Sequence, residues 1–154
     1  MNAICFYRLN EPYCEFSNFS PHPIQLNGLM WPTTEHYFQA QKFPGTAHEE
    51  EIRLTASPMI AARLGRVRSK PLRADWEQVK EVVMKEALYA KFTQHPELCA
   101  LLLSTEDAEL IEHTTNDSYW GDGEDGSGRN RLGFLLTELC GNLNRKKATV
   151  GRKE

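Results

Sequence analysis

The feature that most constrains the fold is an uninterrupted amphipathic segment over residues 76–92. Its apolar positions recur every three to four residues: Trp76, Val79, Val83, Ala87 and Ala90. This spacing places them on one face of an α-helix, whereas a half-buried strand would show strict alternation. No proline or glycine interrupts the segment. The sequence therefore predicts a long helix whose apolar face packs against a core.

Proline and hydroxyl residues divide much of the remaining chain into shorter helices. A helix is expected over 31–43, because Pro32 suits its entry, Thr33 or Thr34 can cap it, and Pro44 ends it. Further helices are expected over 47–56, 58–64, 96–104 and 131–143. The chain is therefore expected to be rich in helices.

Short strands are expected near the N-terminus, over 4–7 and 24–26, where Asn27-Gly28 is typical of a two-residue hairpin turn. Another strand is expected over 110–113, before a glycine-rich loop. A length of 154 residues suits one hydrophobic core. The predicted fold class is mainly α, of the α+β kind: a compact multihelical single domain with a few short strands.

Charge and hydropathy exclude several classes of protein. A formal charge of −3 argues against broad attraction to nucleic acid, which requires a basic surface. The apolar run at residues 100–103 is far too short to span a bilayer. The N-terminus lacks a basic segment followed by a long apolar stretch. We therefore expect a cytoplasmic protein that does not contact membranes.

The cysteines do not support a metal or redox site. Cys5, Cys14, Cys99 and Cys140 are scattered, with no Cys-x-x-Cys pair and no histidine at ligand spacing. We expect free thiols, no bound metal and no cofactor.

A loop over residues 121–126 formally matches the dinucleotide-binding pattern G-x-G-x-x-G. Three acidic residues within it would repel a pyrophosphate, and the chain lacks the alternating strands and helices that this pattern requires. We therefore reject a dinucleotide site. The neighbouring Trp120 and Asn130 instead suggest a loop that stacks on a base and binds a sugar, although a plain acidic turn or a core tryptophan would give the same pattern.

Five segments, in order along residues 6–140, together resemble the NADAR (YbiA-like) family. They are Phe16-Ser-Asn-Phe19, Trp31-Pro-Thr-Thr-Glu-His-Tyr-Phe-Gln-Ala-Gln-Lys-Phe43, Lys91-Phe92, Asn116-Asp-Ser-Tyr-Trp-Gly-Asp-Gly123 and Gly128-Arg-Asn-Arg-Leu-Gly133. The resemblance implies a compact, mainly helical fold and N-glycosidase activity on ribosylated bases. We expect one such domain over 1–143 and a basic, flexible tail over 144–154.

The resemblance also suggests substrates. Bacterial members are associated with phosphorylated intermediates of riboflavin synthesis, which predicts hydrolysis of a ribosylamino-pyrimidine with release of ribose 5-phosphate. One alternative is an ADP-ribosyl-guanine glycohydrolase acting on modified DNA or RNA. Another is a non-catalytic module that binds ADP-ribose or NAD. The sequence does not define an oligomeric state.

Three residues are the candidate catalytic groups: Glu35, Lys42 and Asp122. Cleavage of a ribose from nitrogen passes through a cation-like sugar, so a carboxylate such as Glu35 could stabilise charge or activate water. Lys42 could instead capture C1 as a Schiff base, and Asp122 could bind ribose hydroxyls or position water. Each residue also has a purely structural alternative: Glu35 as a helix cap, Lys42 as an ion-pair partner and Asp122 as a turn residue.

Eight further residues are expected to bind substrate: Ser17, Asn18, Phe19, Arg63, Arg68, Trp120, Gly121 and Asn130. Trp120 and Phe19 would contact the base, and Asn18 and Asn130 would hydrogen-bond to it. Arg63 and Arg68 belong to a basic segment that could hold the substrate phosphate by charge-assisted hydrogen bonds. A solvated basic surface would give the same composition.

Overall fold

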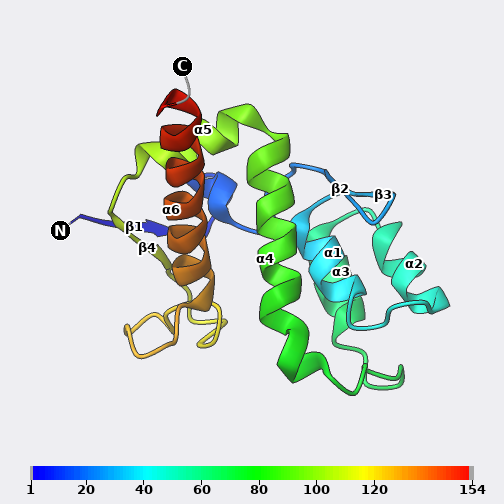
Figure 1. The fold of residues 1–154 in the computed structure, drawn as a ribbon. Helices are drawn as coiled ribbons and strands as arrows, with labels where there is room; N and C mark the ends of the chain where they lie inside the picture. The colour runs from blue at the N-terminus through cyan, green and yellow to red at the C-terminus, as the bar shows by residue number, and fades with distance from the viewer. Residues whose placement is uncertain (1, 153–154) are drawn as a thin grey trace. The chain divides into compact units, whose positions relative to one another are not determined.

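The computed structural model describes residues 2–152, which fall into two compact units. The central unit is Asn18–Gln94, and the terminal unit combines the chain up to Ser17 with the chain from His95 onward. Within the described residues there are six α-helices and four short strands (Figure 1). The predicted fold class, mainly helical with a few short strands, is confirmed.

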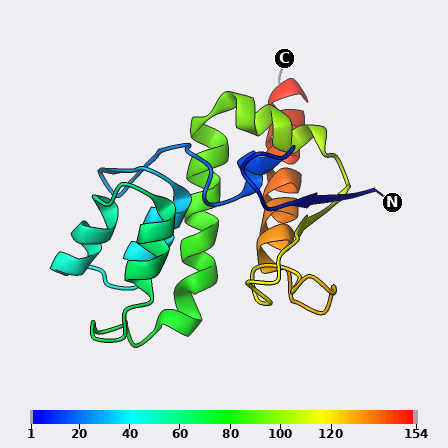
Figure 2. The same ribbon diagram turned by 180° about the vertical axis from the view of Figure 1, so that it is seen from behind.

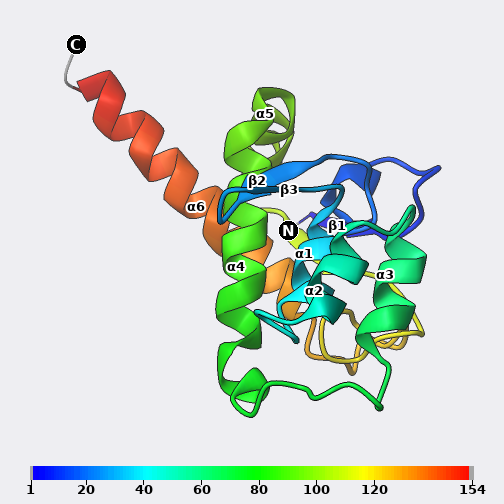
Figure 3. The ribbon, with the colours of Figure 1, turned by 90° about the vertical axis from the view of Figure 1, so that its right-hand side faces the viewer.

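The central unit consists of a hairpin and four helices. Its elements are β2 (Ile24–Leu26), β3 (Leu29–Trp31), α1 (Thr34–Ala40), α2 (Ala47–Arg53), α3 (Pro58–Gly65) and α4 (Trp76–Gln94). Helix α1 contacts α2, α3 and α4, as Figure 3 also shows. The rings of Phe38 and Trp76 meet edge to face with centroids 5.1 Å apart, which joins α1 to the start of α4.

The hairpin forms at the predicted turn. Strand β2 pairs antiparallel with β3, and Leu26 lies opposite Leu29. The two turn residues, Asn27 and Gly28, have φ angles of 54° and 77°. Left-handed backbone at both positions is the reason that Asn-Gly favours this turn.

Side-chain caps fix the starts of three helices. Thr33 accepts a hydrogen bond from the backbone N–H of His36, and Thr46 and Ser57 do the same at α2 and α3. The predicted starts of α2 and α3 are therefore confirmed. The predicted start at residue 31 is wrong, because Trp31 pairs in β3 and α1 begins at Thr34, directly after the cap. The predicted ends are less accurate, because α2 ends at Arg53 rather than at residue 56.

Helix α1 ends at Ala40 and does not reach Phe43 as predicted. The backbone N–H groups of Lys42 and Phe43 each donate to the carbonyl three residues earlier, at 3.3 and 3.0 Å. These tighter bonds close the helix before the proline at position 44. Lys42 consequently lies in a turn after α1.

Helix α4 confirms the long amphipathic segment. It runs to Gln94, and four of the five predicted apolar positions are buried: Trp76, Val83, Ala87 and Ala90. The fifth, Val79, is half-buried. The predicted apolar face is therefore the buried face.

The terminal unit joins the two ends of the chain. Its elements are β1 (Ala3–Phe6), the short 3₁₀ helix η1 (Cys14–Phe16), α5 (Pro96–Ser104), β4 (Glu109–Glu112) and α6 (Arg131–Arg152). Strand β1 pairs in parallel with β4, and α6 contacts β4 (Figure 2). A Cβ at Gly133 would collide with the carbonyl oxygen of Leu110, so the close contact between α6 and β4 requires glycine.

Helix α6 is longer than predicted. It was expected to end at Leu143, but it continues through Arg152. Residues 144–148 contain helix-forming lysine, arginine and alanine and no proline or glycine, and basic side chains suit the C-terminal part of a helix. Of the predicted flexible tail 144–154, residues 144–152 are thus helical, and 153–154 lie outside the described residues.

Candidate active site

Glu35 occupies the first turn of α1, and its side chain is largely buried, with 8% exposed. Its backbone N–H donates to the carbonyl of Asn18 at 3.2 Å. Thr33 supplies the side-chain cap of this helix, so the capping role considered for Glu35 belongs to Thr33. A carboxylate in the first turn is favoured in its charged form by the helix dipole, which suits a base or a group that stabilises positive charge.

One helical turn further on, Gln39 holds the Glu35 side chain. The Gln39 amide nitrogen Nε2 donates to Oε2 of Glu35 at 2.7 Å. Gln39 is only 4% exposed. A spacing of four residues places these two side chains on one helix face, and the hydrogen bond fixes the direction of the carboxylate.

Lys42 is half-buried, and its ammonium lies beside aromatic rings. Nζ is 5.9 Å from the ring centroid of Phe38 and 5.8 Å from that of Trp76. It also donates to the carbonyl oxygen of Gly65 at 3.4 Å. Burial lowers the pKa of Lys42, which the charge of Glu35 partly opposes. A lowered pKa increases the fraction of neutral amine, the form that can attack a carbon atom.

Asn18 has a structural role in the central unit. Its Oδ1 accepts a hydrogen bond from Oγ1 of Thr34 at 2.8 Å, and its Nδ2 donates to Sδ of Met84 at 3.4 Å. These contacts tie the segment before β2 to α1 and α4. Ser17 is buried at the end of η1, and Phe19 is half-buried. Substrate contacts by these three residues stay predictions.

Arg63 lies in the last turn of α3, and Arg68 follows that helix. Both side chains are exposed, and no ion pair engages either one in the part of the chain that the structure describes. The nearby Arg73 differs, because its guanidinium is 2.7 Å from the carboxylate of Asp75. Phosphate binding by Arg63 and Arg68 stays a prediction that their exposure permits.

In the terminal unit, the side chain of Asp122 organises the acidic loop. Its Oδ1 accepts backbone hydrogen bonds from Thr114 and Glu124 at 3.1 and 2.8 Å, and Oδ2 lies 2.8 Å from Nδ1 of His113. Burial raises the pKa of Asp122, but these hydrogen bonds outweigh burial and bring the pKa below its usual value. Both oxygens thus have protein partners, and a contact with ribose stays a prediction.

His113 is a candidate functional residue that the sequence analysis missed. Its imidazole is about half exposed, with 48% of the side chain accessible, and its hydrogen bond to Asp122 raises the pKa of the ring. An aspartate that holds one ring nitrogen leaves the other for proton transfer. The only sequence signal was a histidine at the end of the predicted strand 110–113, which does not identify its partner.

Trp120 is half-buried at the start of this loop. Asp117 accepts backbone hydrogen bonds from Tyr119 and Trp120 on one oxygen, at 2.9 and 2.8 Å. The Tyr119 and Trp120 rings lie edge to face with centroids 4.8 Å apart. Gly121 is required by packing, because a Cβ there would lie 2.7 Å from the Thr114 methyl carbon. Base stacking on Trp120 stays a prediction.

Asn130 is 8% exposed and supports β4. Its Oδ1 accepts from the backbone N–H of Glu112 at 3.0 Å, and its Nδ2 donates to the carbonyl of Leu110 at 2.9 Å. The side chain thus extends the hydrogen bonding along the edge of β4. The backbone of Asn130 itself is left-handed, with a φ of 48°. These bonds give Asn130 a structural role, and the predicted contact with a base stays untested.

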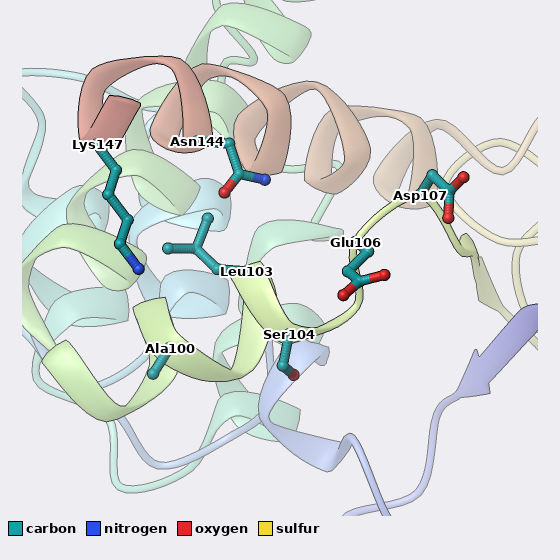
Figure 4. A pocket seen from close by; sticks show the side chains of 7 residues that line it. All are labelled: Ala100, Leu103, Ser104, Glu106, Asp107, Asn144 and Lys147. Atoms are coloured by element: carbon teal, nitrogen blue, oxygen red, sulfur yellow. The ribbon is translucent and has the colours of Figure 1, made fainter. Parts of the chain in front are cut away.

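Two of the pockets formed by the described residues open on the terminal unit. One, of about 420 Å³, has the side chains of Tyr7, Arg8 and His113 in its wall. The other, of about 710 Å³, involves α5 and α6 and is shown in Figure 4. The second pocket is lined by Ala100, Leu103, Ser104, Glu106, Asp107, Asn144 and Lys147. None of the predicted site residues lines this second pocket, so it is not a candidate for the predicted chemistry.

Across residues 2–152, no group of three or more histidine, cysteine, aspartate or glutamate side chains could hold a metal ion. Among the same residues, no helix is both long and apolar enough to cross a membrane. The predicted site residues fall into two groups, each within one unit. Glu35 and Lys42 lie around α1, and Trp120, Asp122 and Asn130 lie around the acidic loop.

Comparison with known proteins agrees with the residue patterns. The NADAR domain family matches residues 5–144. The chain is 62% identical to N-glycosidase YbiA of Escherichia coli (strain K12) over 136 residues, covering 88% of this chain and 85% of that protein. It is 44% identical to the chloroplastic riboflavin biosynthesis protein PYRR of Zea mays over 153 residues, covering 90% of this chain and 25% of that protein.

A solved structure gives the same result. The NMR structure of E. coli YbiA matches with a TM-score of 0.89 and 58% identity, covering 96% of this chain and 88% of that one. The chain belongs to the NADAR domain family. It is a hydrolase that acts on glycosyl bonds, which confirms the predicted enzyme class.

Proposed function

We propose that the chain hydrolyses the N-glycosidic bond of a phosphorylated ribosylamino-pyrimidine and releases ribose 5-phosphate. The observation that carries this proposal is the half-buried Lys42, whose Nζ lies beside the rings of Phe38 and Trp76. Burial there lowers the pKa of the amine, and the charge of Glu35 opposes this shift only in part. The name of the maize relative, a riboflavin biosynthesis protein, supports the substrate class. The reaction uses one water molecule and no cofactor.

In the route through Lys42, the ribosylamine ring opens to an imine between C1 and the substrate nitrogen. The neutral amine of Lys42 adds to C1, and the C1–N bond to the pyrimidine breaks as that nitrogen takes a proton and leaves. The remaining Schiff base joins Nζ to C1. Water then adds to C1, and breakage of the Nζ–C1 bond returns the lysine and releases ribose 5-phosphate.

Glu35 supplies proton transfer in this route. Its carboxylate can accept a proton from the water that adds to C1 and pass that proton to Nζ of Lys42 as the Nζ–C1 bond breaks. In a direct route without the Schiff base, the same carboxylate would stabilise the cation-like sugar and activate water at C1. The lowered pKa of Lys42 favours the first route.

The experiment is incubation of purified protein with a phosphorylated ribosylamino-pyrimidine, followed by detection of ribose 5-phosphate by mass spectrometry. A parallel reaction contains an oligonucleotide bearing ADP-ribosylated guanine in place of the pyrimidine. A separate binding assay uses free ADP-ribose. Release of ribose 5-phosphate supports the proposal. Release of ADP-ribose alone would show the nucleic-acid substrate, and ADP-ribose binding without turnover would show a binding module.

The same reactions test independence from metal. We expect turnover to be unchanged after treatment with EDTA. Activity that EDTA abolishes and zinc restores would contradict the metal-free mechanism.

A further inference from the structure

Gly65, the last residue of α3, occupies a position where the backbone does not require glycine. Alanine is the more favourable residue in a helix, by virtue of its lower conformational entropy cost. The neighbourhood nevertheless excludes a side chain. A Cβ at this position would collide with Oε1 of Gln39 and would lie 2.7 and 2.8 Å from its Cδ and Cβ. The Gln39 side chain therefore lies directly on the bare backbone of Gly65.

The orientation of the Gln39 amide satisfies only one of its two polar atoms. Its Nε2 donates to Glu35, while its buried Oε1 has no hydrogen-bond partner among the described residues. A buried carbonyl oxygen without a donor lowers stability. The amide therefore leaves Oε1 without a hydrogen bond, whereas Nε2 keeps the hydrogen bond that directs the Glu35 carboxylate.

Gly65 also contacts the second catalytic candidate. Its carbonyl oxygen accepts the hydrogen bond from Nζ of Lys42 at 3.4 Å. Gly65 thus contacts Lys42 directly through its carbonyl oxygen. It also acts on Glu35 indirectly, because the absence of a Cβ leaves room for the Gln39 side chain that binds Glu35.

We propose that Gly65 and Gln39 are positioning residues for Glu35 and Lys42. Gln39 fixes the direction of the carboxylate, and Gly65 provides both the surface on which Gln39 lies and the acceptor that holds the ammonium. Groups fixed before the reaction need no rearrangement during it, which lowers the barrier. The inference rests on the proposed function for the roles of Glu35 and Lys42 in turnover.

Two variants of the full chain test the positioning roles of Gly65 and Gln39. Gly65→Ala displaces Gln39 by its added methyl group, and Gln39→Met keeps most of the side-chain volume but removes the amide. We expect each variant to lower kcat by about tenfold or more with KM within about twofold, as loss of positioning predicts. Gly141→Ala in α6 is the matched control, because a Cβ there has only Nη1 of Arg145 within reach, at 3.5 Å.

A second measurement does not require turnover. The charged groups that act on the pKa of Lys42 are Glu35, Arg66, Glu77 and Lys80. Acylation of Lys42 by a small reagent, followed by mass spectrometry across a pH series, gives the midpoint at which its amine becomes reactive. We expect both variants to lower this midpoint, because displacement of the Glu35 carboxylate removes a group that favours the charged amine. Gly141→Ala should leave the midpoint unchanged.

Wild-type kcat and an unchanged Lys42 midpoint in both variants would overturn the positioning role. If Gly65→Ala does not fold, as judged by circular dichroism, Gln39→Met alone decides the result. If the wild-type protein does not act on the ribosylamino-pyrimidine, the proposed function fails. The acylation midpoint still decides whether Gly65 and Gln39 organise Lys42 and Glu35.

Discussion

The imidazole Nδ1 of His113 lies 2.8 Å from Oδ2 of Asp122, and this contact shifts the two groups in opposite directions. The pKa of His113 rises above its ordinary value of 6.5, whereas that of Asp122 falls below 3.8. Asp122 also accepts two backbone hydrogen bonds, one from Thr114 just after β4 and one from Glu124 in its loop. The pair therefore connects the protonation of one exposed ring to the shape of the acidic loop.

This pair predicts how stability depends on pH. A raised histidine pKa stabilises the folded state fully below pH 6.5, and that contribution is lost as pH rises through the folded value. The lowered pKa of Asp122 contributes above 3.8 and is lost as pH falls through its folded value. The melting temperature should therefore decline as pH rises above about 6.5, since the histidine then loses its charge.

The variant His113→Gln should flatten this decline, as measured by thermal melting across that pH range. An identical slope in His113→Gln would show that the pair does not control stability in this range.

Glu35→Gln should lower kcat by about a hundredfold or more, the effect expected for loss of a positioned acid or base. The helix should survive, because Thr33 caps it, and loss of the charge near the N-terminus should reduce the free energy of unfolding by about 1 kcal/mol or less. Glu97→Gln, at the same position of α5 but exposed, is the control. Steady-state kinetics beside thermal melting separate the two effects, and a near-normal kcat would exclude Glu35 from the chemistry.

Lys42 can be tested by trapping with borohydride during turnover. Reduction of a Schiff base should add the mass of the sugar phosphate to the peptide that contains Lys42. Lys42→Arg should give no adduct and lose activity, because a guanidinium stays protonated and does not form the imine. Absence of an adduct in the wild-type protein, together with turnover by Lys42→Arg, would instead favour direct hydrolysis assisted by Glu35.

Asn130→Ala should reduce the free energy of unfolding by about 1–3 kcal/mol, because it leaves the buried carbonyl of Leu110 and the partly buried N–H of Glu112 without their hydrogen bonds. Urea denaturation measures this loss. Asn142→Ala, on an exposed part of α6, should change it by less than about 0.5 kcal/mol. Unchanged stability with a raised KM would show that Asn130 serves the substrate instead of β4.

Features encoded by neighbouring residues could be predicted from the sequence. Thr33 and Ser57 mark helix starts because their side chains bond to backbone groups three residues later. The spacing of Glu35 and Gln39 predicts a shared helix face, on which the structure shows their hydrogen bond. Asn27-Gly28 defines the hairpin because both residues adopt left-handed backbone.

Features that depend on distant residues could not be predicted in this way. The carboxylate of Asp122 was expected to face a substrate, yet it meets His113 and two backbone groups supplied by the strand end and the loop. No local spacing identifies such partners, because they come together only when the loop closes.

By itself, the sequence determined the helix-rich class, the hairpin, the helix caps and the family motifs, since each depends on residues within a few positions of one another. Tertiary structure decided the parallel pairing of β1 with β4 and the environment of Lys42. Parallel pairing joins strands from distant parts of the chain, and the pKa of an amine depends on the burial and charges that packing creates around it.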